Sequence, residues 1–460
     1  MNEKSQSLLK KICAEEIKKD CFNIQVDGYF IHGALAEMLR IKFLESKGFK
    51  QMTNRHGCSL KYIIRNFFLS LLSFVNLFFK KQSYDYFIYS FPRVEKIGDK
   101  YVDKFTDPII DYTGLSKRKY IIFERSRGGI HYTPRTHNDH LIYTDAVDLV
   151  LNIISRIFFV LFYIIHKKDI DKYWCCLLCV YGEVVSKNVI KRLVLHKILY
   201  VKFYCYILKR LKIKKLISVS RNTFSVIMYA SKELGIPVYE LQHGITYAET
   251  TEYSGYRHPK YTPDKFLAFG NNSPNDVYGI DVDKIINIGW ALNLYIEGIK
   301  DKRMQGVKST DVLIISDPTI TEEMLDVTCK LSQYYPDVCF YFRPHPMEII
   351  NDKHLEIIKS ISNIKLQDRT VNICVVLHNF INVIGQNSTV LYEALSMGKK
   401  VGKLFMSGLS SDYLNEDDKK CFFEIHREED LLLMMKSNCS DRKSKKIYSL
   451  FRPELFEQLM

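Results

Sequence analysis

Two side chains that can bind phosphate lie in a short stretch stiffened by proline, YFRPHP at 341–346. Arg343 offers a planar guanidinium that can hold two phosphate oxygens at once. His345 can donate a hydrogen bond to the same group, and the prolines on either side of it restrict the backbone. The stretch therefore predicts an anion-binding loop. The alternative is a proline-rich turn that carries a surface arginine.

A second candidate phosphate site lies in GQNSTVLYEALSMGKKV at 385–401. Asn387, Ser388 and Thr389 are small polar residues at a predicted helix start. Free N–H groups and the positive end of the helix dipole make such a terminus an anion site. Glu393 follows one turn later and can accept hydrogen bonds from a ribose diol. The alternative is an ordinary helix cap with an isolated glutamate.

The third stretch, YELQHG at 239–244, ends in a histidine and a glycine. Gly244 lets a ligand approach the backbone closely, and His243 is either catalytic or structural. The polar segment after it carries candidate bases, Glu249 and Glu252, and candidate acceptor contacts, Tyr253, Tyr256 and Arg257. This segment predicts a place where an acceptor hydroxyl could lose its proton.

All three stretches follow predicted strands. Residues 215–220 and 237–242 are strand-like and flank a helical pattern at 221–236, which predicts a crossover between parallel strands. In open α/β sheets, ligands bind beyond the carboxyl ends of the strands. We therefore expect the three stretches to line one cleft.

A polar, charged segment at 297–310 separates this unit from a second one. In the second unit, strands are predicted at 311–316, 338–343, 380–384 and 400–405, and helices at 320–335, 351–361 and 389–397. The alternation predicts an α/β fold with two Rossmann-like domains facing a central cleft. The expected divisions are a first domain at 1–296, a linker at 297–310, a second domain at 311–440, and a C-terminal helix at 441–460 that packs back on the first domain.

The composition is that of a globular protein of 460 residues with a formal net charge of +14. This surplus favours an anionic partner such as a membrane surface or a phosphorylated metabolite, and no long basic block or familiar motif points to nucleic acid. The 12 cysteines are scattered. The densest group, CCLLC at 175–179, lacks the second ligand pair that zinc needs, so we expect buried thiols in a reducing cytoplasm.

Two apolar stretches, 62–79 and 149–165, need an interpretation in terms of membranes. Polar residues recur in both at helical spacing, and basic pairs follow them at Lys80–Lys81 and Lys167–Lys168. Spanning helices need about 20 mostly apolar residues without charges, which both stretches lack. They predict amphipathic helices that pack in a core or rest on an anionic leaflet. A true membrane span is the less favoured interpretation.

The three motifs in this order resemble bacterial glycosyltransferases of GT-B fold that build capsule, O-antigen, lipopolysaccharide or teichoic-acid polymers. Sialyltransferase-like, Kdo-transferase and teichoic-acid glycerophosphate polymerase families carry similar motifs. The resemblance covers roughly 215–405. It implies that Arg343, His345, Ser388 and Thr389 hold the donor phosphate, that Glu393 holds the ribose, and that His243 acts near the transferred group. The acidic pair followed by glycine of the sialyltransferase-like families is absent from the N-terminal half, which leaves the base among Glu249, Glu252 and His243.

The resemblance implies a metal-independent glycosyltransferase without a cofactor. It would move a sugar from a nucleotide-sugar donor on the second domain to a lipid-linked saccharide acceptor on the first. We expect a cytoplasmic enzyme, peripheral at the inner face of the plasma membrane. A possible metal-binding triplet, DVD at 281–283, lies in a solvent-like loop. The alternatives are a glycerol- or ribitol-phosphate transferase, a nucleotide-sugar epimerase, and a non-catalytic polysaccharide-assembly protein.

Overall fold

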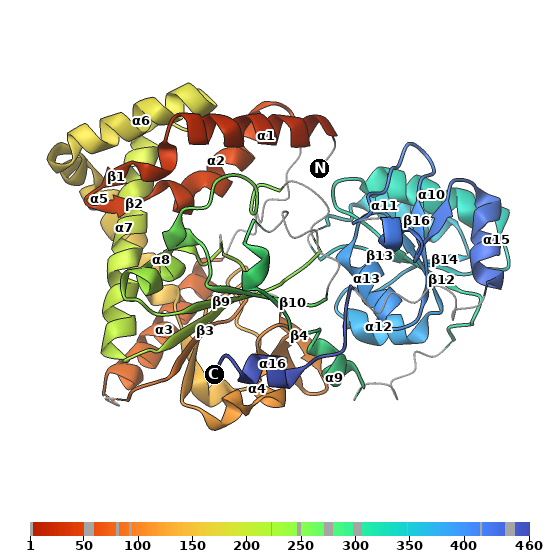
Figure 1. Ribbon diagram of the computed structural model, residues 1–460. Coiled ribbons are helices and arrows are strands. Elements are labelled where there is room, and N and C mark those ends of the chain that lie inside the picture. Colours follow the sequence, from red (N-terminus) through yellow and green to blue (C-terminus); the bar gives the residue numbers. More distant parts are fainter. Residues whose placement is uncertain are drawn as a thin grey trace.

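Two parallel sheets, each covered by helices, make up the protein. The computed structural model describes residues 3–49, 59–79, 82–91, 94–221, 223–245, 250–270, 279–297, 306–346, 348–414, 416–437 and 447–460. The two sheets lie in separate lobes, on the left and the right of Figure 1. The α/β class and the two Rossmann-like domains facing each other, which is the GT-B arrangement, are therefore confirmed.

The first sheet has seven parallel strands in the order β11-β10-β9-β8-β3-β6-β7. Their bounds are β3 Tyr86–Tyr89, β6 Tyr120–Glu124, β7 Leu141–Tyr143, β8 Lys215–Ser218, β9 Val238–Leu241, β10 Lys265–Ala268 and β11 Ile285–Asn287. The predicted crossover is confirmed, because β8, α8 (Ser225–Glu233) and β9 follow one another and Leu216 lies opposite Val238 in parallel register. β3, β6 and β9 are buried along their whole length, as expected for strands covered on both faces.

The second sheet has six parallel strands in the order β14-β13-β12-β15-β16-β17. The strands are β12 Val312–Ile315, β13 Phe340–Arg343, β14 Ile364–Leu366, β15 Asn382–Gly385, β16 Lys400–Leu404 and β17 Phe423–Ile425. Its helices are α10 Thr321–Tyr334, α11 Asp352–Ser360, α12 Ile373–Asn379, α13 Thr389–Ser396, α14 Glu416–Lys419 and α15 Glu428–Lys436. All four predicted strands are present. The edge strands β14 and β17 escaped prediction because each has three residues and is only partly buried.

The other helices and two hairpins belong to the first domain. The helices are α1 Glu3–Lys18, α2 His32–Ser46, α3 Leu60–Phe79, α4 Asp107–Tyr112, α5 Asp145–Ile165, α6 Lys167–Tyr181, α7 Lys187–Arg210 and α9 Leu292–Glu297. One hairpin pairs β1 (Gln25–Val26) with β2 (Tyr29–Phe30), and the other pairs β4 (Val94–Ile97) with β5 (Lys100–Asp103). Helices α1, α2 and α6 share one apolar core. A disulfide bond between Cys21 and Cys176 links two parts of this core. The expectation of buried thiols at 175–179 is wrong, because Cys175 and Cys179 are exposed and Cys176 is bonded.

The two apolar stretches form α3 and α5, and packing in a core is the wrong interpretation of their surroundings. In the most apolar part of each helix, only 22% of the α3 residues and 6% of the α5 residues are buried. Both helices are long and apolar enough to cross a membrane by length and composition. Their surroundings are considered further below.

The C-terminal residues 447–460 return to the first domain, where a backbone hydrogen bond joins Trp290 N to Ser449 O over 3.0 Å. The Lys215 ammonium donates to the carbonyl oxygens of Leu459 and Met460. The continuous helix predicted for 441–460 is replaced in the described part by α16 (Pro453–Glu457). Residues 447–452 instead bond to the segment after β11, and Pro453 begins the helix. Residues 298–305 of the expected linker and 438–446 lie outside the described residues.

Candidate active site

The loop after β9 is held in place by the side chain of Gln242, which is buried. Its amide nitrogen donates to Gly244 O over 2.9 Å, and its amide oxygen accepts from Phe269 N over 2.8 Å. Phe269 follows β10, so one side chain ties together the ends of two neighbouring strands. His243, between Gln242 and Gly244, is thereby presented at the carboxyl edge of the sheet.

His243 belongs to a chain of polar contacts. Its Nδ1 lies 3.1 Å from Tyr253 Oη, and its Nε2 lies 3.6 Å from Glu252 Oε2. Glu252 Oε1 accepts a hydrogen bond of 2.6 Å from Ser220 Oγ, which follows β8. The histidine side chain is 17% exposed and that of Glu252 18%, so both can meet a ligand while staying oriented. Both ring nitrogens thus have a polar neighbour, and the imidazole can act as a general base once a substrate hydroxyl takes the place of one of them.

The segment that carries Glu252 is held from the side by α2. Arg40 donates from Nη1 to Ser254 O over 2.6 Å and to Thr251 O over 3.2 Å. The opposite side of the Arg40 guanidinium pairs with the buried Glu16 carboxylate of α1. Two N-terminal helices, to which the sequence assigned no role, therefore position a candidate catalytic carboxylate.

The predicted acceptor contacts occupy different environments. Tyr253 is buried and hydrogen-bonds to His243, so it orients the imidazole. Tyr256 is exposed, and Arg257 is half-buried. All three line a small cavity of about 40 Å³ beside Glu252, together with Glu37 and other residues of α2. Glu249 lies outside the described residues.

Carboxyl groups around this cavity hold protons more tightly than usual. Burial, together with repulsion from Glu252, raises the pKa of Glu37 to about 7. Burial also raises the pKa of Glu240 to about 7, although Arg221 Nε lies 2.8 Å from its carboxylate and opposes the shift. The site therefore contains acid groups that titrate near neutral pH, beside the more exposed Glu252.

In the second domain, the start of α13 has the predicted cap. Ser388 Oγ accepts from Val390 N over 3.3 Å. Asn387 is engaged by the neighbouring loop, since its Oδ1 accepts from Asp412 N over 2.9 Å. Thr389 is the first helical residue. The helix start is therefore an ordered terminus whose first N–H groups point to the carboxyl edge of the sheet.

The loop after β13 departs from expectation at Arg343. Its guanidinium is buried and donates to the backbone carbonyl oxygens of Asp368, of Arg369 over 3.1 Å and of Val371 over 2.8 Å. Burial lowers its pKa to about 10. The geometry thus assigns Arg343 to holding the 368–371 loop. His345 is half-exposed at the strand end, and its backbone N–H donates to Glu348 Oε2 over 2.7 Å.

Two of the contacts between the domains lie at the predicted motifs. A Cβ added to Gly244 would lie 3.6 Å from Thr389 Oγ1, so the histidine loop directly faces the α13 start. Lys104, beside the β4–β5 hairpin, places Nζ 3.5 Å from Glu393 Oε1 and 3.5 Å from Glu95 Oε1. Glu393, expected at a ribose, therefore has a cation of the first domain beside it.

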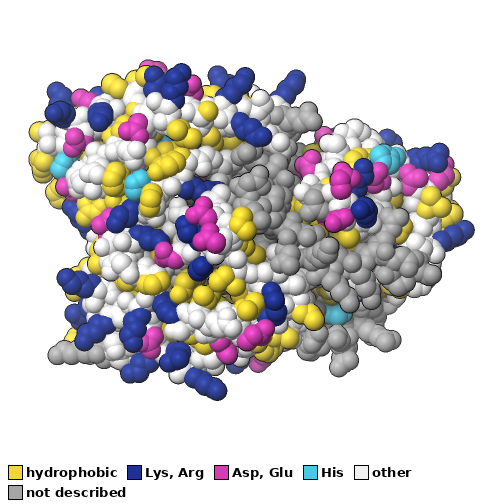
Figure 2. All heavy atoms as spheres, viewed as in Figure 1, with side chains coloured by type: hydrophobic (Ala, Val, Ile, Leu, Met, Phe, Trp, Pro, Cys, Tyr) yellow, Lys and Arg dark blue, Asp and Glu magenta, His cyan; other side chains and the backbone are white. Residues whose placement is uncertain are grey.

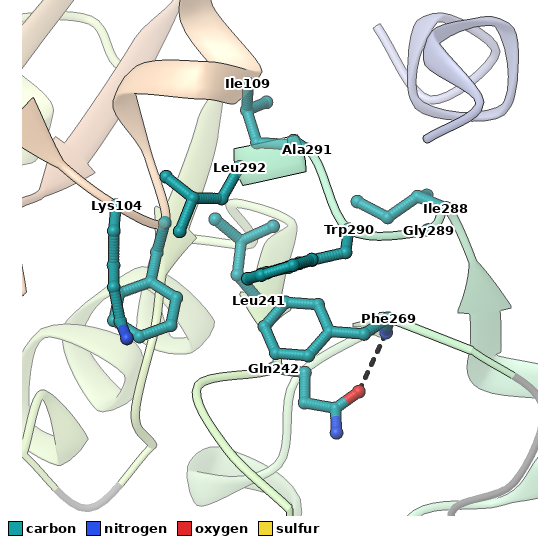
Figure 3. Close-up of a pocket in the computed structure, with 11 residues that line it drawn as sticks. Lys104, Ile109, Leu241, Gln242, Phe269, Ile288, Gly289, Trp290, Ala291 and Leu292 are labelled. Carbon is teal, nitrogen blue, oxygen red and sulfur yellow. Dashed lines mark hydrogen bonds between the residues drawn. The ribbon is translucent and has the colours of Figure 1, made fainter. Parts of the chain in front are cut away.

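A mainly apolar cavity of about 10 Å³, the size of one water molecule, adjoins this contact and is lined by Lys104, Gln242, Trp290 and neighbouring residues. Figure 3 shows the Trp290 ring lying over Leu241 and Phe269, with the Gln242 to Phe269 hydrogen bond at its edge. The cavity walls come from the ends of strands β9, β10 and β11. Among the described residues, no group of three or more His, Cys, Asp or Glu is arranged to hold a metal ion.

Sequence reasoning missed Glu37, Arg40, Lys104 and Ser220. Each meets the site from a distant part of the chain, and none belongs to a recognisable motif. Ser220 is the last residue of a predicted strand, which was the one available signal.

No protein-family model matches the chain, and no curated protein matches its sequence. Solved structures with a similar course of the chain include the UDP-GlcNAc 2-epimerase from Methanocaldococcus jannaschii (10% identity, 81% of this chain and 98% of that chain, TM-score 0.49). Others are the UDP-GlcNAc 2-epimerase from Neisseria meningitidis bound to UDP-GlcNAc (14%, 69% and 81%, 0.41) and MurG from Acinetobacter baumannii (8%, 82% and 98%, 0.41). Two of these three carry the activity named by the epimerase alternative. All three TM-scores lie below 0.5, so we draw no conclusion about the reaction from them.

Proposed function

We propose that the protein is an enzyme that acts on a nucleotide-activated sugar held between the two domains. The observation that carries this proposal is the approach of Gly244 to Thr389. It brings a polar helix start suited to a phosphate within reach of a histidine–carboxylate pair. An activated sugar needs both, because its phosphate must be held on one side while a proton moves on the other.

The reaction that we propose is transfer of the sugar to a saccharide acceptor. Negative charge develops on the leaving phosphate as the glycosidic bond breaks, and the N–H groups of the α13 start would stabilise it. His243, oriented by Tyr253 and Glu252, would take the proton of the acceptor hydroxyl. Tyr256, which is exposed beside Glu252, would contact the acceptor. A lipid-linked acceptor of a surface polysaccharide is the proposed acceptor class.

Epimerisation of the nucleotide sugar is the second candidate, and a carboxyl group beside Glu252 favours it. Burial and repulsion from Glu252 raise the pKa of Glu37, which lines the cavity, to about 7. Removal and return of a proton at a sugar carbon needs groups that exchange protons near neutral pH. An epimerase would use the same phosphate site and would need no acceptor.

The test is to measure thermal shift and product formation with CMP-, CDP-, UDP- and GDP-sugars. A nucleotide sugar that binds the native state raises its melting temperature. The Thr389→Val variant should lose most of that shift. The control is Ser360→Ala, which changes the last residue of a different helix of the same domain, α11, and should keep the shift. The absence of a shift with all four nucleotide classes would refute the proposal. Conversion of the sugar without any acceptor would establish the epimerase and exclude the transferase.

A further inference from the structure

Helices α3 and α5 turn their polar sides toward the protein and their apolar sides outward. On α3, the Asn66 amide donates to Gly129 O over 2.8 Å, and Ser70 Oγ donates to Tyr143 O over 2.5 Å. On α5, Ser155 is buried. The polar residues that make these helices amphipathic are therefore used inside the molecule. This is the reverse of the usual arrangement for a surface helix of a protein surrounded by water.

The outer faces are mainly apolar, with a few polar side chains exposed among the apolar ones. The exposed large apolar residues are Leu60, Tyr62, Ile63, Ile64, Phe68, Leu71, Leu72, Val75 and Phe79 on α3, and Val150, Ile153, Ile157, Phe158, Val160, Leu161, Ile164 and Ile165 on α5. The two helices pack against each other, so these residues form one continuous surface, here called the α3–α5 face. Surfaces of this kind mark interaction sites, because water solvates them poorly.

Exposed basic side chains lie on and beside the α3–α5 face, and Asp169 follows the Lys167–Lys168 pair in the first turn of α6. Lys61 and Arg65 on α3, Arg156 on α5 and the Lys167–Lys168 pair at the start of α6 are exposed. α3 contains no acidic residue. The acidic residues of α5, Asp145 and Asp148, lie in its first turn and pair with His131 and Arg125 over 2.8 Å each. In Figure 2, dark-blue basic side chains lie among yellow apolar ones over the first domain, on the left.

We infer that the α3–α5 face lies in the headgroup and outer acyl region of an anionic lipid leaflet, with both helices parallel to the membrane plane. Apolar side chains enter the acyl boundary, and the basic side chains reach back to the lipid phosphates. A spanning position does not fit, because one side of each helix is hydrogen-bonded or packed against protein. A second copy of the chain does not fit the charges, because two basic rims would face each other.

The position of the α3–α5 face connects it to the cleft. Ser70 bonds to Tyr143, the last residue of β7, and accepts from Ala146 N in the first turn of α5 over 3.0 Å. These atoms lie at the carboxyl edge of the first sheet, the edge that also presents His243. A leaflet in contact with the α3–α5 face would therefore lie at the same edge of the sheet as His243, with strands β8, β3 and β6 between β7 and β9. This deepens the proposed function by placing a lipid-linked acceptor at the edge of the sheet that carries the site, but the surface itself does not depend on that function.

Vesicle flotation of the full chain tests the inference, with no nucleotide sugar present. The probe is a phosphatidylcholine vesicle with about one third phosphatidylglycerol. The Ile157→Asn, Leu161→Asn and Ile164→Asn triple variant should lower the binding constant about a hundredfold at both low and high salt, because three apolar insertions are lost. These side chains are 64%, 55% and 64% exposed, so the fold should be kept.

The matched control carries Ile349→Asn, Leu433→Asn and Leu450→Asn, at apolar residues 84%, 67% and 79% exposed away from the face. It should bind vesicles like the unmodified chain. Charge reversal at Lys61, Arg65 and Arg156 should weaken binding at low salt only. Unchanged flotation of the α5 triple variant would overturn the inference. Resistance of the unmodified chain to alkaline extraction would overturn it in favour of a span, and a dimer that the triple variant dissociates would overturn it in favour of a second copy.

The same variants separate this inference from the proposed function. The α5 triple variant should keep the thermal shift with a nucleotide sugar, because its three substituted side chains are exposed on α5 and take no part in the approach of Gly244 to Thr389. Thr389→Val should keep vesicle binding and lose the thermal shift. Failure of one result without the other identifies which of the two proposals is wrong.

Discussion

The loop after β13 and the loop after β9 both carry a motif at a strand end, but their side chains do different things. In the loop after β13, Arg343 donates to the backbone of residues 368–371, and Glu348 accepts from the His345 backbone. In the loop after β9, His243 faces Glu252, and Gly244 approaches Thr389 of the other domain. A motif of suitable residue types thus identifies a loop, whereas contact across the domains identifies the side chains that can meet a substrate.

His243→Ala should have the largest effect and tests the β9 side of this comparison. Loss of a general base lowers a rate by about 10²–10⁴-fold, and we expect product formation from the nucleotide sugar to fall by this factor. The melting temperature should change little, since the histidine is partly exposed. The rate comes from a product assay at saturating donor. A variant that melts far below the unmodified chain would show that His243 is structural.

Arg343→Ala should mainly destabilise the protein, in contrast to the rate loss that the sequence motif predicts. Three backbone carbonyls would lose a charged, buried partner, which costs about 3 kcal/mol of the free energy of unfolding. Urea unfolding measures this loss. Arg343→Lys should restore only part of it, because an ammonium cannot reproduce the fork of the guanidinium. An Arg343→Ala variant that is fully stable but inactive would show that Arg343 binds the phosphate.

Glu240 allows a pH test of the acidic surroundings of the β9 loop. Burial raises the pKa of Glu240 to about 7, above its unfolded value. The folded state therefore binds the proton more tightly, and stability should fall as the pH rises from below the unfolded pKa through the folded one, by about 2–3 kcal/mol. In the Glu240→Gln variant, the free energy of unfolding measured from pH 4 to pH 8 should no longer show this fall of about 2–3 kcal/mol. An identical pH profile would exclude the raised pKa.

The smallest predicted effect concerns the contact that brings the hairpin of the first domain to the second. Lys104 and Glu393 lie 3.5 Å apart and are mostly buried. A double-mutant cycle with Lys104→Met and Glu393→Gln should give a coupling energy of about 1 kcal/mol. Zero coupling would mean that the two side chains share the space without stabilising the closed arrangement of the domains.

Local patterns predicted much of the fold. The β8–α8–β9 unit and the four strands of the second domain were found because each is an apolar run bounded by turn residues. Patterns of this kind do not say what surrounds an element. The spacing in α3 and α5 showed which side is polar, yet a polar side can face either water or, as with Asn66 and Ser70, the inside of the protein.

The candidate site was predicted less completely, because its contacts join distant parts of the chain. The sequence indicated His243, Glu252 and Thr389 separately. The contacts of Glu252 with Ser220, of the Glu252 segment with Arg40, and of Glu393 with Lys104 depend on how strands and helices far apart in the sequence are brought together. Arg343 shows the opposite limit, since a residue type suited to phosphate is equally suited to three backbone carbonyls.

The return of residues 447–460 to the first domain means that the polypeptide passes between the lobes twice. Two passages restrict how the lobes can turn. The lobes should open and close about one preferred axis. Free rotation of one lobe against the other should be suppressed, because two connections join them. A protease cut in either passage alone would leave the halves joined through the other, and their rotation would become less restricted.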